Sequence, residues 1–282
     1  MPCVIFSGGM ICDGWAGEGK RPAAHPNLVE RRHVMSDPQD FFERHHAAYR
    51  VSRAHARGAD LDTLASAMAP LTGTRVLDVA TGTGHTALRL AAQGAAVTGL
   101  DPSPAMLREA EALARQGTVA VTWMIGTAEH LPFAAAAFER VTCRRAAHHF
   151  TDIAQFLQEA RRVLVPGGWI GISDMTAPAD AIGHLNTLER LRDPSHRQAL
   201  TREQWQTSLH SAGFCEISAE PSTEPMSWQQ WLSPVSPQEA AGQQALAYLR
   251  QIARPGALAE LPDRFIKHRL VIWAQKPQAP LP

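Results

Sequence analysis

The chain has 282 residues, enough to bury one large core together with a lid or a small subdomain. Its 27 lysines and arginines balance 27 aspartates and glutamates, and this zero formal charge argues against nucleic acid as the main partner. The four cysteines and thirteen histidines show no metal-ligand spacing, so we expect no metal site.

The first 34 residues are rich in glycine, proline and small side chains and have no sustained period. We predict that residues 1–34 form a disordered leader, or that they result from an over-extended start site. They lack the basic start and the cleavage site of a secretion signal. No apolar run in the chain approaches the roughly 18 residues that cross a membrane. We therefore expect a cytoplasmic protein without an integral membrane segment.

Residues 35–70 have a helical pattern, and we predict that they cover a core at residues 71–175. In this core, strand and helix patterns alternate, which predicts an α/β fold with a doubly wound, Rossmann-like parallel sheet. Sheets of this kind bind ligands beyond the carboxyl ends of their strands. The predicted strands are 74–80, 95–100, 119–124, 140–144 and 168–174, and the predicted helices are 85–93, 103–116 and 151–164.

The most informative stretch is VLDVATGTG (76–84), which joins the first strand to a helix. Glycines let the backbone approach a ligand, and the free N–H groups of a helix start favour a negative group. Gly82 begins a GxGxxA sequence that formally matches a dinucleotide fingerprint. However, the carboxylate of Asp78 would face the ligand and repel a pyrophosphate. It suits a cationic amine, as in S-adenosylmethionine.

The second predicted strand ends at Asp101, another carboxylate at the same edge of the sheet. A carboxylate in this place can bind both ribose hydroxyls of a nucleotide, so it fits either cofactor. The alternative is that Asp101 caps the helix that begins at Pro102-Ser103-Pro104. The spacing from the glycine loop favours the ribose role.

After Asp174 the pattern changes, and we predict that residues 176–282 hold substrate-lid helices and the final two strands. An apolar face in this region includes Trp228, Trp231 and Leu232. The segments are a helical stretch at 180–211, a strand at 213–220, two helices at 228–254 and a last strand at 264–275.

The chain resembles class I S-adenosylmethionine-dependent methyltransferases, most of all the branch of ubiquinone/menaquinone C-methyltransferases and methyltransferases of type 11. The resemblance covers roughly residues 40–277 and rests on several blocks in the right order. It implies a seven-stranded sheet whose last two strands form an antiparallel edge, with a helical insertion between them. The blocks are 76–84, 99–107, 126–133, 138–144, 147–150 and 162–168.

This resemblance implies S-adenosylmethionine as the cofactor and assigns a set of residues to it. The loop would hold the methionine part, Asp101 the ribose and Met106 the adenine side. Thr127 stands where the family often has aspartate, and it would accept a weaker hydrogen bond from the adenine. The implied cofactor-binding residues are Asp78, Ala80, Thr81, Gly82, Gly84, Asp101, Pro102, Met106, Thr127, Ala128, Glu129 and Arg144.

Catalysis of methyl transfer mainly requires alignment of the acceptor and exclusion of water. A base is needed only for an acceptor that arrives protonated. His148 and His149 follow the fourth strand, and histidine has a suitable pKa for that role. The alternative is that one of them packs or caps the helix near Asp152. Tyr49 and His55 would either contact the acceptor or pack the cover helices.

The resemblance and the bulky apolar C-terminal segment predict a small, partly apolar organic acceptor. A quinone-like ring carbon is favoured, and an oxygen or nitrogen of a secondary metabolite is the alternative. Two other classes stay open, namely an NAD-dependent oxidoreductase and a cofactor-binding protein without catalysis. The sequence also leaves open whether the chain forms a homodimer.

Overall fold

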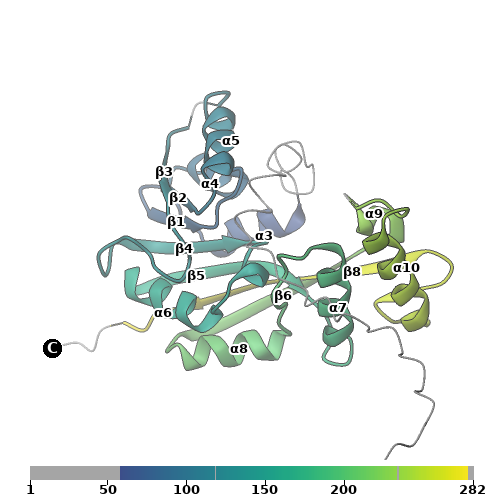
Figure 1. The fold of residues 1–282 in the computed structure, drawn as a ribbon. Coiled ribbons are helices and arrows are strands. Elements are labelled where there is room, and N and C mark those ends of the chain that lie inside the picture. Colours follow the sequence, from purple (N-terminus) through teal and green to yellow (C-terminus); the bar gives the residue numbers. More distant parts are fainter. Residues whose placement is uncertain (1–57, 118, 234, 279–282) are drawn as a thin grey trace, which may run out of the picture. The chain divides into compact units, whose positions relative to one another are not determined.

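The computed structural model describes residues 58–117, 119–233 and 235–278, so the leader, Tyr49 and His55 lie outside the described residues. Figure 1 shows how the helices and strands are arranged. The strands are β1 (Arg75–Val79), β2 (Ala96–Asp101), β3 (Val121–Ile125), β4 (Phe138–Arg144), β5 (Leu164–Thr176), β6 (Cys215–Ser227), β7 (Ala259–Glu260) and β8 (Arg264–Gln275). The helices are α3 (Ala59–Ala67), α4 (His85–Ala91), α5 (Pro104–Ala114), the 3-10 helix η1 (Ala147–His149), α6 (Ile153–Val163), α7 (Ile182–Arg192), α8 (Arg202–Ser211), α9 (Trp228–Leu232) and α10 (Ala240–Ile252).

The strands form one mixed sheet in the order β3-β2-β1-β4-β5-β8-β6. Strands β1 to β5 pair in parallel, and β8 pairs antiparallel with both β5 and β6. The chain order reverses between β1 and β4, which is where doubly wound sheets bind ligands. The predicted Rossmann-like sheet with an antiparallel edge is confirmed, and the two-residue strand β7 adds a short pairing to β8.

Helices cover both faces of the sheet, and the periodicity of their apolar residues explains why they form there. In α6, Phe156, Leu157, Ala160 and Val163 lie on one face and are fully buried. Asp152 begins this helix because its carboxylate accepts the N–H of Gln155. Helices α6 and α8 pack on one face of the sheet, while α3 and α4 pack on the other.

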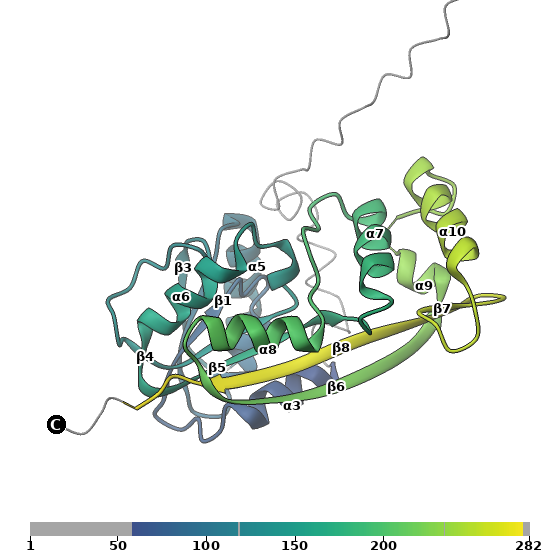
Figure 2. The same cartoon turned by 90° about the horizontal axis from the view of Figure 1, so that it is seen from below.

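The C-terminal region differs in detail from the sequence-based prediction. The predicted helical stretch 180–211 is two helices, because Pro194 cannot continue α7 and residues 193–201 form an irregular segment. Strand β6 is longer than predicted, since it pairs with β8 over most of its length. Figure 2 shows these two strands side by side, with α9 and α10 at one end.

A separate apolar core lies among α7, α9 and α10. The indole of Trp231 stacks on Phe265 of β8 at a ring distance of 4.9 Å. Its Nε1 donates to Glu189 at 3.0 Å, so the buried indole keeps a hydrogen bond.

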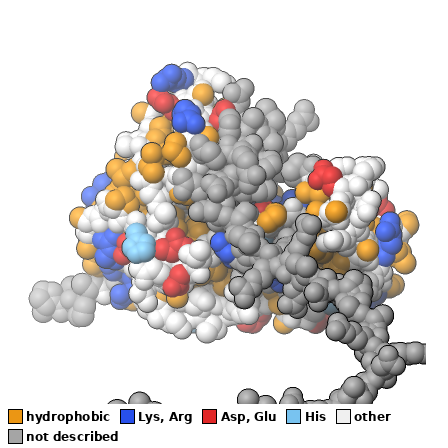
Figure 3. Space-filling model, in the orientation of Figure 1, with side chains coloured by type: hydrophobic (Ala, Val, Ile, Leu, Met, Phe, Trp, Pro, Cys, Tyr) orange, Lys and Arg blue, Asp and Glu red, His pale blue; other side chains and the backbone are white. Residues whose placement is uncertain are grey.

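On the face shown in Figure 3, basic and acidic side chains are interspersed among apolar ones, as the balanced composition suggests.

Candidate active site

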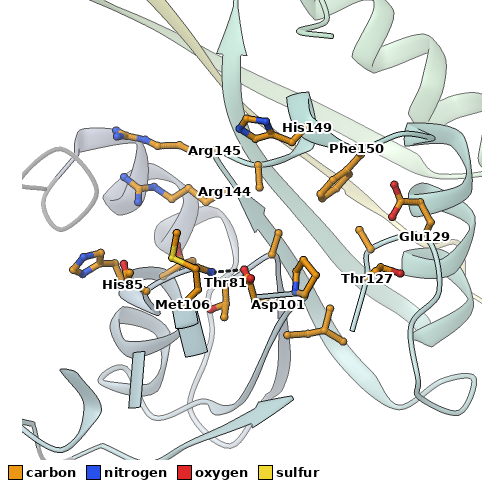
Figure 4. A pocket seen from close by; sticks show the side chains of 18 of the residues that line it. Thr81, His85, Asp101, Met106, Thr127, Glu129, Arg144, Arg145, His149 and Phe150 are labelled. Atoms are coloured by element: carbon orange, nitrogen blue, oxygen red, sulfur yellow. Dashed lines mark hydrogen bonds between the residues drawn. The ribbon is translucent and has the colours of Figure 1, made fainter. Parts of the chain in front are cut away.

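A cavity of about 300 Å³ opens at the carboxyl ends of β1, β2 and β4. This volume is at the lower end of the range for small-molecule sites. In Figure 4, Arg144 and Arg145 approach it from one side, and Thr127 and Glu129 lie on the opposite side. Ten of the twelve predicted cofactor-binding residues line the cavity, namely Ala80, Thr81, Gly82, Asp101, Pro102, Met106, Thr127, Ala128, Glu129 and Arg144.

The loop between β1 and α4 forms the floor of this cavity, and its glycines have different tasks. Gly82 has a φ of 55°, and a Cβ there would meet no protein atom within 4 Å. Glycine at this position therefore provides a left-handed backbone next to open space. Gly84 also has a left-handed φ, but its Cβ would lie 2.7 Å from Trp123 and 2.9 Å from Ala110. Gly84 does not line the cavity, and the close approach that it permits is to the protein itself.

Asp101 lies at the end of β2 and holds the loop in place. Its Oδ2 accepts the N–H of Gly82 at 2.8 Å, the hydrogen bond drawn in Figure 4. Its Oδ1 accepts the N–H of Ser103 at 2.9 Å. Ser103, not Asp101, is the residue that caps α5, because its hydroxyl accepts the N–H of Met106. The capping alternative for Asp101 is therefore wrong, and its carboxylate lines the cavity.

Asp78 is placed differently from the sequence-based expectation, because it lies behind the loop rather than on the cavity wall. Its two oxygens accept the hydroxyls of Thr81 at 2.6 Å and Thr142 at 2.7 Å. Burial raises its pKa to about 6, although both hydrogen bonds act in the opposite direction. A donor in the cavity would therefore meet Thr81 before it met this carboxylate.

The opposite wall is built from the segment after β3. The carboxylate of Glu129 accepts the N–H of Thr151 at 3.0 Å and the hydroxyl of Thr151 at 2.9 Å. These bonds tie the wall to the loop that precedes α6. Thr127 and Ala128 complete this side. The Glu129 side chain is thus oriented by the protein rather than by solvent.

A buried ion cluster stands at the other side, where β4 ends. The carboxylate of Asp60, from α3, binds Arg144 Nε at 2.8 Å and Arg145 Nη2 at 2.6 Å, and it also accepts the hydroxyl of Ser173. Burial alone would raise the pKa of Asp60, but the hydrogen bonds and charges of Arg145 and Arg144 hold it well below its usual range. Sequence reasoning did not include Asp60 or Arg145 in the site. The sequence signal for this cluster is the pair of arginines at the end of a buried strand. Two buried arginines require a carboxylate partner.

The two predicted catalytic histidines face different surroundings. His148 does not line the cavity, and its Nδ1 lies 2.5 Å from Asp174 Oδ1. His149 does line the cavity, next to Ala146 and Phe150. Since Asp152 caps α6, neither histidine performs that function.

Burial favours the neutral form of the His149 ring. Its Nδ1 lies 3.2 Å from the carbonyl oxygen of Ser195, a geometry in which Nδ1 carries the proton and Nε2 the lone pair. Burial lowers the pKa of His149 well below its ordinary value, and the nearby charge of His148 acts in the same direction. Ser195 belongs to the irregular segment after Pro194, so the interruption of the predicted helix supplies this contact.

Comparison with known proteins agrees with this geometry. A family model described as a methyltransferase domain matches residues 77–172. The uncharacterized methyltransferase YcgJ of Bacillus subtilis is 32% identical over 194 residues, which cover 68% of this chain and 77% of YcgJ. The chain belongs to the class I S-adenosylmethionine-dependent methyltransferases. The crystal structure of YcgJ superposes on this methyltransferase with a TM-score of 0.71 at 26% identity, over 78% of this chain and 99% of that chain.

Other relatives of this methyltransferase match over a smaller share of their length. A ubiquinone/menaquinone biosynthesis C-methyltransferase of Paracoccus denitrificans is 44% identical over 105 residues, 36% of this chain and 42% of that protein. A ubiquinone biosynthesis O-methyltransferase of Azorhizobium caulinodans is 29% identical over 157 residues, 53% of this chain and 62% of that protein.

Membership of this family distinguishes between the two cofactors that the loop sequence fits. S-adenosylmethionine is the methyl donor of this enzyme, and the NAD-dependent reading is set aside. The cavity fits such a donor, because Gly82 leaves open space and a carboxylate stands at the end of β2.

Among residues 58–117, 119–233 and 235–278, no group of three or more histidine, cysteine or acidic side chains could hold a metal ion. In these same ranges, no helix is both long and apolar enough to span a bilayer. Cys143 is buried in β4, where burial raises the pKa of its thiol, as expected for a structural cysteine.

Proposed function

We propose that this enzyme methylates a small, partly apolar organic acceptor, with a quinone-like ring carbon as the favoured target. The observation that carries the proposal is the position of His149, a neutral ring on the wall of the donor cavity between Ala146 and Phe150. A phenolic ring would find apolar contacts and a proton acceptor there. The quinone-pathway C-methyltransferases among the relatives support the same choice.

The proposed donor site uses the ten cavity-lining residues that the sequence assigns to it. When bound, S-adenosylmethionine supplies a methyl group that its positive sulfur already activates. Asp101 would accept hydrogen bonds from the ribose, since its carboxylate is held in place by Gly82 and Ser103. Met106 would contact the adenine side, and Arg144 would lie near the methionine part.

The protein's own side chains would carry out the other steps of the reaction. His149 would accept the proton that the acceptor loses, because its Nε2 carries the lone pair while Nδ1 faces Ser195. His148 would act as a positioning residue. Asp174 fixes its ring, and the next residue in the chain is His149. Tyr49 and His55 stay predicted acceptor contacts that lie outside the described residues.

A mutation tests the role of His149. His149→Ala should lower turnover by at most roughly 10²–10⁴-fold, because a positioned general base contributes about that much and the lowered pKa of His149 reduces its strength as a base. Donor affinity, measured by calorimetry, should be unchanged. The matched control is His210→Ala, since His210 is exposed on α8. Turnover of His149→Ala at the wild-type rate would exclude this residue as the base.

Oxygen methylation is the second candidate, favoured by the O-methyltransferase among the relatives. A hydroxyl acceptor needs its proton removed, so the same position of His149 would serve it. The two reactions differ in the product. Incubation with donor carrying a ¹³C-methyl group gives a carbon-bound or an oxygen-bound methyl, which NMR chemical shift distinguishes.

A further inference from the structure

Arg269 of β8 is a buried cation that has no partner among the described residues. The residue is 8% exposed, and its Nε is buried without any hydrogen bond. The guanidinium forms no hydrogen bond or ion pair with any residue in the described part of the chain. Burial lowers its pKa to about 10, and the charge of Arg145 adds to this effect. Burial of a charged group without a partner is unfavourable, so its retention here requires an explanation.

Lys267 lies two residues away on the same strand, and alternation along a strand places both side chains on one face. Burial lowers the pKa of Lys267 to about 7, and the charge of Arg269 lowers it further. No ion pair within 4 Å involves Lys267 in the residues that the structure describes. Glu224 faces it across the β6–β8 pairing, but Glu224 is exposed to solvent.

The acidic side chains around these two cations already have partners. Asp60 binds Arg144 and Arg145. Asp174 binds His148, and Glu189 binds Arg192 at 2.6 Å. Arg269 and Lys267 therefore give this part of the interior an excess of positive charge.

The sheet register places these cations on the same face of the sheet as Arg144, which lines the donor cavity, although neither of them lines that cavity itself. Arg144 pairs with Ser173, and Ser173 pairs with Val271 of β8, so these three residues lie side by side on one face. Arg269 follows on that face, opposite Met175. Strand spacing and rise place its Cα roughly 12 Å from that of Arg144. A single-ring molecule can span this separation with the help of the long arginine side chains.

We propose that the acceptor carries a carboxylate at the end remote from the methylated atom, and that Arg269 and Lys267 bind this group. The inference rests on the proposed methyl transfer to a small acceptor. Arginine binds a carboxylate through two parallel hydrogen bonds, and a buried site strengthens each of them. The methionine carboxylate of the donor has the same chemistry, so the test must separate the two sources.

The first arm of the test separates a small-molecule extract of the source organism on an anion exchanger at neutral pH. Each fraction is incubated with the full chain and with donor labelled in its methyl group. We expect label in molecules of the retained, anionic fraction. Label only in unretained molecules would overturn the carboxylate site and leave the proposed methyl transfer intact. Absence of label from every fraction would overturn both.

The second arm measures the Arg269→Gln variant with an acceptor from the retained fraction. We expect the KM for the acceptor to rise at least tenfold while the donor dissociation constant stays unchanged. Arg250→Gln, on the exposed side of α10, is the matched control. An unchanged KM would overturn the proposal. A weaker donor affinity at unchanged KM would also overturn it, because Arg269 would then bind the donor carboxylate.

A third measurement shows whether the variant folds. Removal of a buried, unpartnered charge should leave the thermal midpoint of the ligand-free enzyme unchanged or higher. If Arg269→Gln does not fold, Arg269→Lys retains a charge but cannot bind a carboxylate through two parallel hydrogen bonds. Arg269→Lys should also raise the KM for the acceptor. A wild-type KM in Arg269→Lys would contradict the proposal.

Discussion

The carboxylate of Asp78 illustrates how burial changes a residue that the sequence places at the donor site. Its oxygens are occupied by Thr81 and Thr142, and burial raises its pKa to about 6. An ionised carboxylate in this position destabilises the ligand-free protein. The positive charge of a donor in the cavity would act across the loop and favour the ionised form of Asp78. Stability and donor affinity should therefore respond to this residue in opposite directions.

The Asp78→Asn variant tests this opposition. The folded-state pKa lies above the unfolded value, so the wild type should lose stability as the pH rises from about 4 through 6, by at most on the order of 3 kcal/mol. The variant should lack this loss and bind S-adenosylmethionine more weakly. Urea unfolding and calorimetry at both ends of this pH window measure the two effects.

The control for this experiment is Asp180→Asn, since the Asp180 side chain is largely exposed. Subtraction of its pH profile removes the contribution of other titrating groups. Parallel pH profiles for wild type and Asp78→Asn would contradict the role assigned to burial.

At the scale of elements, the connection from β1 to α4 combines a ligand-facing turn with a packing contact. Gly82 has open space beside it, whereas a Cβ at Gly84 would clash with Trp123 of β3 and Ala110 of α5. From the sequence the two glycines look equivalent, because each fits the same motif. The structure assigns them different neighbours, and substitutions should separate their effects.

Gly84→Ala should destabilise the fold by roughly 2–5 kcal/mol, because a left-handed alanine costs about 1–2 kcal/mol and overpacking about 1–3 kcal/mol. Gly82→Ala carries only the backbone cost, and it should mainly weaken donor binding. Urea unfolding and donor calorimetry on both variants give the comparison. Equal destabilisation with equal loss of donor affinity would show that the two glycines are not separable.

The irregular segment after α7 is the element that sequence patterns missed. Apolar spacing predicts one helical stretch at 180–211, but Pro194 ends α7 two residues after Arg192. The segment then supplies the Ser195 carbonyl to His149, and its N–H groups of Arg197 and Gln198 donate to the carbonyl of His148. The departure from regular structure thus lies beside the candidate base.

At the scale of the whole molecule, local patterns predicted the order of the core elements and most of the predicted cofactor-binding residues that line the cavity. Loops at strand ends meet at one edge of a parallel sheet, so the blocks that follow β1, β2 and β4 come together without further information. The Asp60 cluster could not be predicted in this way, because Asp60 and Ser173 are 113 residues apart. The same applies to Arg269, whose lack of a partner among the described residues is visible only in the folded structure.

The arrangement around the cavity also gives the two ends of the site different characters. We propose that Asp101 and the Glu129 wall face the nucleoside end of the donor, and that Arg144, Arg145 and His149 face its reacting end, because these residues line the cavity. A donor that bound in the reverse direction would place its sulfur away from His149. The orientation of the donor is therefore the central claim from which the catalytic and acceptor proposals follow.

A crystal structure of the enzyme with S-adenosylhomocysteine tests this claim most directly. We expect the ribose hydroxyls on Asp101, the adenine between Met106 and Ala128, and the sulfur on the side of His149. The space beyond the sulfur should lead towards Arg269. A product bound outside this cavity, or with its sulfur directed away from His149, would contradict the account.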